Sequence, residues 1–123
     1  MELTVTTRII SGVVILDMVG RLWILDLPLR DLIRKMLDDG HRFFVLNLTD
    51  LSYIDSSGLG QMIMIWTSIN NRNGHMTLLR PTARVQKLLE MTKLHRVFEI
   101  FRDENEAVIE AAKGRGAVFE IGA

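Results

Sequence analysis

The chain has no cysteine, no long apolar run and no excess charge of either sign, and each absence argues against a class of protein. Without cysteine there is neither a disulfide framework nor a thiolate for catalysis or metal binding. The longest apolar run, residues 62–66, is far shorter than the ~20 residues that span a bilayer. Fifteen basic residues balance fifteen acidic ones, so the basic excess that binds nucleic acid phosphates is missing. We therefore expect neither a membrane nor a nucleic acid as a direct partner.

The chain does contain enough apolar residues for a core of its own. With 123 residues, 48% of them hydrophobic, it is expected to form a single globular domain over residues 1–123. The first residues lack the basic start and the apolar segment of a signal peptide, so the simplest expected location is the cytoplasm.

The pattern of apolar residues and turn signals predicts alternating strands and helices. Two β-branched segments, 4–10 and 13–22, flank the turn signal Ser11-Gly12 and are expected to form an N-terminal β-hairpin. The other expected elements are a helix capped by Asp26, a strand at 43–48, a helix at 56–70, a strand at 75–79, a helix capped by Thr82, a strand at 97–101, a helix opened by Asp103 or Glu104, a flexible joint at 114–116 and an apolar tail at 117–121. Because helices that separate strands act as crossovers, this order predicts an α/β fold with a mostly parallel sheet.

A pair of serines at the start of the helix 56–70 is the most informative local feature. Backbone N–H groups at a helix N-terminus have no intrahelical partner and the macrodipole is positive there, so the position holds a phosphate well. The serine pair therefore has two interpretations. In the first, Ser56 or Ser57 caps the helix; in the second, one of them accepts a phosphoryl group. Gly58 and Gly60 are expected to let another backbone or a ligand approach closely.

Catalytic and cofactor chemistry is weakly supported. A nucleophile elbow needs glycine two residues before the serine, where Ile54 and Asp55 stand instead. The histidines are scattered and lack the spacing of metal ligands: they are His41, His75 and His95. The segment Gly58-Leu59-Gly60 is too short for a dinucleotide fingerprint. We expect no catalytic residue, no cofactor and no metal site.

Residues 46–60, with their central Asp55-Ser56-Ser57-Gly58-Leu59-Gly60 motif, resemble the signature of STAS domains, specifically of bacterial anti-sigma factor antagonists. Segments 73–79, 85–94 and 97–100 also resemble that family. The resemblance runs from about residue 3 to residue 112 and leaves 113–123 as a C-terminal tail. It implies the STAS fold, in which a mixed, mostly parallel sheet carries an N-terminal hairpin and about four α-helices.

The family resemblance implies a switch and not a catalyst. In the family, the unphosphorylated antagonist binds an anti-sigma factor that is also a serine kinase, which frees the sigma factor. The kinase then phosphorylates the first serine of the motif, here Ser56, the complex dissociates, and a phosphatase restores the serine. The resemblance assigns partner binding to Trp23, Asp55, Ser56, Ser57, Gly58 and Leu59.

The loop after Gly20 departs from the family pattern. Arg21 stands where an acidic residue is common, and Trp23 stands where an aspartate is expected. Because this loop lies beside the phosphorylation site in the family, Trp23 either contacts a partner or packs against the first helix. Two other functions stay open: a non-phosphorylated STAS subunit of a lipid-transport or stress-sensing complex, and an enzyme or nucleotide-binding domain.

Overall fold

A five-stranded sheet with the spatial order β1-β2-β3-β4-β5 organises the chain. The computed structural model describes the backbone of residues 3–22 and 28–122 and the side chains of residues 3–22 and 29–113. The strands are β1 (Thr4–Ile10), β2 (Val13–Leu22), β3 (Phe43–Ile54), β4 (His75–Leu79) and β5 (Glu99–Phe101). β1 pairs with β2 in antiparallel fashion, and the other neighbours are parallel, as predicted.

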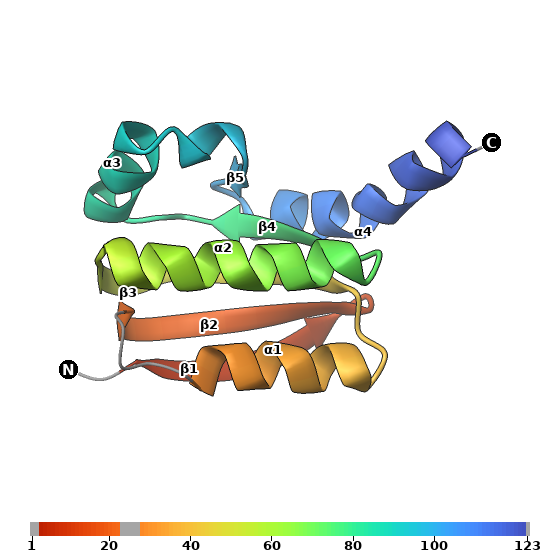
Figure 1. Ribbon diagram of the computed structural model, residues 1–123, viewed down its shortest axis with the longest axis horizontal. Helices are drawn as coiled ribbons and strands as arrows, with labels where there is room; N and C mark the ends of the chain where they lie inside the picture. Colours follow the sequence, from red (N-terminus) through yellow and green to blue (C-terminus); the bar gives the residue numbers. More distant parts are fainter. Residues whose placement is uncertain (1–2, 23–27, 123) are drawn as a thin grey trace.

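The helices follow the predicted order and form two layers. They are α1 (Pro28–Asp38), α2 (Ser56–Asn71), α3 (Ala83–Met91), the short 3₁₀ helix η1 (Leu94–Arg96) and α4 (Glu104–Gly122). Figure 1 shows α1 and α2 side by side over one face of the sheet, with α4 behind the sheet. The crossover helices α1 and α2 therefore cover one face of the central strands, and the last helix, α4, covers the other.

The buried residues of the central strands point alternately into two apolar clusters. On the face covered by α1 and α2, Leu16, Leu46 and Leu78 pack with helix residues such as Ile33 and Met62. The opposite cluster, under α4, is smaller: its members are Val13, Ile15, Val45, Leu79, Ala107, Val108 and Ala111. Because β2 and β3 are covered on both sides, their first halves are apolar at almost every position, a pattern that is typical of central parallel strands.

A polar cluster joins four elements at the α4 face. The Arg8 guanidinium donates to both carboxylate oxygens of Asp17, at 2.6 and 3.0 Å, and to Glu104 at the start of α4, at 2.6 Å. The side-chain amide of Asn47 donates to Asp17 at 2.7 Å. The cluster thus ties β1, β2, β3 and α4 together where the apolar contacts of α4 begin.

Three predicted boundaries are wrong. β3 does not end at residue 48 but continues to Ile54, because two register shifts in its pairing with β2 accommodate the polar residues. Residues 94–96 form η1, so the last strand begins at Glu99 and not at Val97. α4 continues through the predicted joint at 114–116, since each glycine costs a helix only about 1 kcal/mol. Asp26 and Trp23 lie outside the described residues.

The polar cluster makes stability depend on pH in a defined direction. The hydrogen bond from Arg8 lowers the pKa of Asp17 below its ordinary value. The stabilisation is therefore fully present above the unfolded-state pKa of about 3.9 and is lost as the pH falls through the lowered pKa. We expect Asp17→Asn to lower the free energy of unfolding by roughly 1–2 kcal/mol at neutral pH, with the difference from the parent shrinking at more acidic pH.

Urea unfolding of both proteins between pH 7 and pH 3 measures this difference. Asp39→Asn is the matched control, because Asp39 is exposed and forms no ion pair within the described residues. A parent–variant difference that stays constant across the whole pH range would contradict the assigned role of the Asp17 charge.

Candidate functional site

Asp55, and neither serine, caps α2. The backbone of Asp55 is extended, with φ −106° and ψ −176°, and its carboxylate accepts a hydrogen bond from the Gly58 N–H at 2.7 Å. Of the two interpretations of the serine pair, the helix cap is therefore wrong for Ser56 and Ser57. Both serines lie in the first turn and are exposed. Because the carboxylate of Asp55 supplies the cap, the hydroxyl of Ser56 is not used for it.

Gly58 is needed for a contact inside the protein. A Cβ atom on Gly58 would lie 2.1 Å from the carbonyl oxygen of Leu22, far closer than atoms can approach. The end of β2 therefore presses directly on the first turn of α2. The expectation that another backbone approaches closely is therefore confirmed at Gly58, which is buried, whereas at Gly60 a Cβ would meet nothing within 4 Å.

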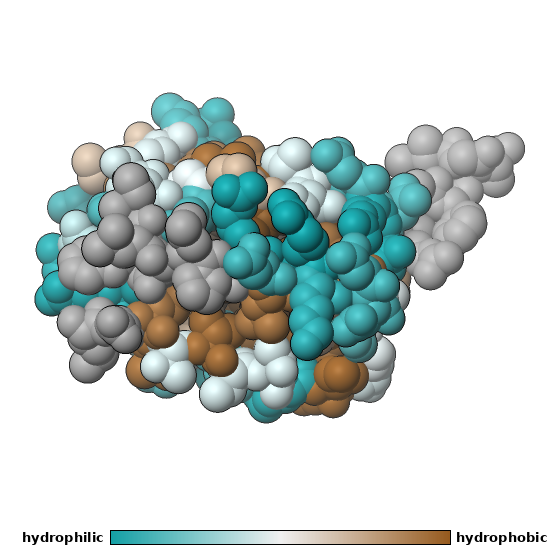
Figure 2. Space-filling view, turned by 60° about the horizontal axis from the view of Figure 1, so that its bottom comes forward, coloured by the Kyte–Doolittle hydropathy of each residue, from teal (hydrophilic) through white to brown (hydrophobic). Residues whose placement is uncertain are grey.

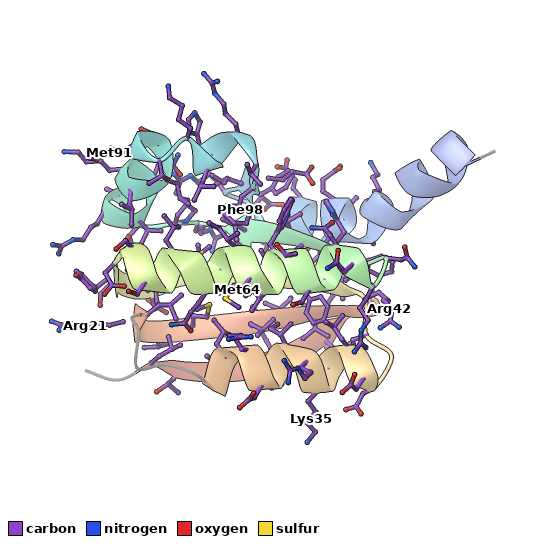
Figure 3. All side chains as sticks on the ribbon, viewed as in Figure 1. Arg21, Lys35, Arg42, Met64, Met91 and Phe98 are labelled. Carbon is purple, nitrogen blue, oxygen red and sulfur yellow. The ribbon has the colours of Figure 1, made fainter. Side chains whose placement is uncertain are left out.

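The exposed side of α2 carries apolar residues in line with Ser56. Positions 56, 60, 63, 64 and 67 recur at helical spacing, and all but the partly buried Gly60 are exposed. Ile63 is 37% exposed and Met64, labelled in Figure 3, is 45% exposed. Leu59 faces the other way, at 5% exposure, and packs in the main core. The surface near the serines therefore consists of hydroxyl groups followed by an apolar patch.

An aromatic ring between two arginines borders this surface. Tyr53, three residues before Ser56, has the guanidinium of Arg21 5.7 Å from its ring centroid and that of Arg84 5.2 Å away. Figure 3 shows Arg21 extending from the end of β2, at the same end of the molecule as the start of α2. We call Arg21, Tyr53 and Arg84 the arginine–tyrosine stack. Guanidinium groups stack on aromatic faces, and the stack places positive charge at the end of the molecule where α2 begins.

Sequence reasoning did not identify Tyr53 or Arg84 as part of the site. The three members of the stack come from β2, β3 and α3, and only the observation that Arg21 replaces an acidic residue hinted at positive charge here. Of the predicted site residues, the structure brings Asp55, Ser56 and Ser57 together at one surface. It places Gly58 and Leu59 beneath that surface, while Trp23 lies outside the described residues.

Within the part of the chain that the structure describes, no three acidic or histidine side chains meet as a metal site would require. His75 contacts Glu99 across neighbouring strands. None of the described helices is both long and apolar enough to cross a membrane.

The model of the STAS domain family matches residues 4–107. The chain belongs to the STAS domain family. An anti-sigma F factor antagonist of Paenibacillus polymyxa is 31% identical over 104 residues, which cover 80% of this chain and 86% of that protein. These matches confirm the family resemblance of the Asp55–Gly60 motif and its surroundings.

Solved structures agree with this assignment. The crystal structure of a candidate anti-sigma factor antagonist from Thermotoga maritima superposes with a TM-score of 0.80 at 30% identity, covering 88% of this chain and 94% of that one. The phosphorylated form of the Bacillus cell fate determinant SpoIIAA has a TM-score of 0.68 at 21% identity, over 87% of this chain and 98% of that one. The second likeness shows the shared STAS fold.

The two glycines of this STAS motif provide a matched pair of substitutions. We expect Gly58→Ala to lower the free energy of unfolding by about 3 kcal/mol or more, because the Leu22 backbone cannot move away without disturbing β2. Gly60→Ala is expected to raise it by about 0.5–1 kcal/mol, since alanine favours the helix and the space is open. Chemical unfolding of both variants tests the pair, and equal effects would refute the assigned contact.

Proposed function

We propose that this STAS protein is an anti-sigma factor antagonist whose binding is switched by phosphorylation of Ser56. The observation that carries the proposal is the position of Ser56: it is exposed in the first turn of α2, and Asp55 already supplies the cap. Relatives named as antagonists of anti-sigma factors support the same role. The protein acts by binding and carries out no catalysis of its own.

The switch needs a group transfer catalysed by the partner. The anti-sigma factor acts as a serine kinase and supplies a nucleoside triphosphate. The Ser56 oxygen attacks the terminal phosphorus, the bond to the nucleoside diphosphate breaks, and the hydroxyl proton passes to a base of the kinase. A phosphatase hydrolyses the phosphoserine and restores the hydroxyl. The antagonist needs no cofactor, and the exchange takes place in the cytoplasm.

The geometry of α2 accounts for release of the partner. A phosphoserine carries about −1.5 to −2 charges, which the positive N-terminus of α2 tolerates in the free protein. In the complex the same charge would be desolvated between two surfaces and would face acidic groups of the partner. The fold therefore need not change for binding to fail.

The surface around Ser56 indicates what the partner must offer. Ile63 and Met64 form an apolar patch one to two turns beyond the serines, and the arginine–tyrosine stack adds positive charge at the side. We infer that the anti-sigma factor presents apolar side chains flanked by acidic ones. Asp55, Ser56, Ser57 and Trp23 are the proposed contacts, whereas Gly58 and Leu59 contribute by holding the first turn of α2 in place.

Ser56→Asp is expected to weaken binding to the cognate anti-sigma factor by about tenfold or more, because a carboxylate reproduces part of the phosphate charge. The melting temperature should stay near that of the parent, since acidic groups suit a helix N-terminus. Titration calorimetry measures the affinity, and a thermal melt measures the stability.

Ser11→Asp is the control for charge alone. Ser11 is exposed in the β1–β2 turn with φ 52°, a conformation that aspartate tolerates, and it lies at the opposite end of β2 from the site. This variant should bind like the parent. Equal affinities of the Ser56→Asp and Ser11→Asp proteins would refute the switch.

Substitutions of Asp55 separate its capping role from a role in phosphorylation. Asp55→Ala should lower the free energy of unfolding by about 1 kcal/mol, whereas Asp55→Asn should keep most of the cap. We expect Asp55→Asn to be phosphorylated more slowly than the parent, because the carboxylate helps to orient the Ser56 hydroxyl. Kinase assays with mass spectrometry should place the phosphate on Ser56.

Two outcomes would contradict these assignments. Phosphate on Ser57 with Ser56 unmodified would show that the acceptor is wrong. A parental rate for Asp55→Asn would show that Asp55 is only a cap.

A further inference from the structure

A groove of about 290 Å³ lies between α1 and α2, separate from the surface around Ser56. Its apolar wall consists of Ile33, Leu37 and Ile65, each at most 2% exposed. At 1.5 Å per residue, Ile65 is about 13 Å along the helix axis from Ser56. The groove therefore belongs to the middle and C-terminal part of α2, away from the proposed switch.

The other wall of the groove is polar and strongly basic. Arg30 and Arg34 come from α1, and Arg72 follows the end of α2. Ser68 and Asn71, both on α2, complete this polar wall. In Figure 2, where the α1 side of the molecule comes forward, hydrophilic side chains gather beside apolar surface. Three guanidinium groups and an apolar wall thus line one small cavity.

The positive charge of the groove is only partly neutralised. Arg72 donates to Asp38 at 2.7 Å, so one of the three charges is paired. Arg30 and Arg34 form no ion pair with any residue that the structure describes, although Asp31 and Asp39 are exposed on or beside α1. Like charges four residues apart repel each other on a helix. A dianion in the groove would remove this repulsion.

We propose that the groove binds a small molecule that carries a phosphate dianion on an apolar body. Guanidinium groups match phosphate oxygens in pairs, and the charges of Arg30 and Arg34, which pair with no described residue, balance two negative charges. The volume is at the lower end of the range for small-molecule pockets, which suits a compact organophosphate. The apolar part of the molecule lies over the edges of Ile33, Leu37 and Ile65 that reach the groove, and Ser68 and Asn71 supply polar contacts.

Titration of the ¹⁵N-labelled protein with phenyl phosphate tests the proposal directly. We expect saturable shifts of the amide signals of Ile33, Arg34, Ser68 and Asn71, with little change at Ser56. Inorganic phosphate and phenol should each bind at least about tenfold more weakly, because each lacks half of the proposed contacts.

Arg30→Gln/Arg34→Gln should weaken phenyl phosphate binding by about tenfold or more. Arg96→Gln, which removes an exposed arginine outside both the groove and the surface around Ser56, should bind like the parent. The double variant should fold normally, because both replaced side chains lie at the surface of α1 and glutamine is a good helix former. It should also be phosphorylated at the parental rate, so failure in the groove is distinguishable from failure at Ser56.

Three results would overturn the proposal. The first is the absence of saturable shifts at millimolar phenyl phosphate. The second is unchanged affinity in the double variant. The third is tighter binding of an acidic peptide than of phenyl phosphate, which would make the groove a protein-docking site.

Discussion

The contact between the Leu22 carbonyl and the first turn of α2 is the constraint on which the rest of the site depends. Only glycine at position 58 allows the end of β2 to come so close, since a Cβ would lie 2.1 Å from that oxygen. The contact fixes where α2 begins, and the Asp55 cap then fixes which residues of the first turn face outward. The exposure of Ser56 is thus a consequence of how Gly58, two residues later, packs against the Leu22 carbonyl.

The two-sided sheet explains why polar residues are few and paired where helices cover both faces of a strand. The first halves of β2 and β3 lie between helical layers, so a charge there needs a partner within reach. Asp17 has Arg8 and Asn47 on the two neighbouring strands. Thr77, fully buried on β4, donates its hydroxyl hydrogen bond to the Ala107 carbonyl of α4 at 2.9 Å. These contacts set the position of α4 on a cluster made largely of alanine and valine.

Local patterns were sufficient to predict the order of the strands and α-helices, and the motif placed the proposed site at the start of α2. The turn signal Ser11-Gly12 and the apolar run of β3 depend on neighbouring residues only. The true end of β3 depends on its register with β2, which no single segment contains. The sequence does not reveal the arginine–tyrosine stack or the groove between α1 and α2 for the same reason, because the residues of each come from separate elements. Whether Asp55 or one of the two serines after it caps α2 depends on the backbone angles at the start of the helix, which the local sequence does not contain.

In the proposed switch, the identity of the cap also bears on how long the phosphorylated and unphosphorylated forms would survive. Where a serine hydroxyl closes the first turn of a helix, esterification removes that hydrogen bond and frays the helix. Here the closing group is the carboxylate of Asp55, which phosphorylation leaves unmodified. Both forms would therefore expose the same amount of chain to proteases and turn over at the same rate. The ratio of the two forms in a cell would then record the balance of kinase and phosphatase activity, undistorted by selective degradation.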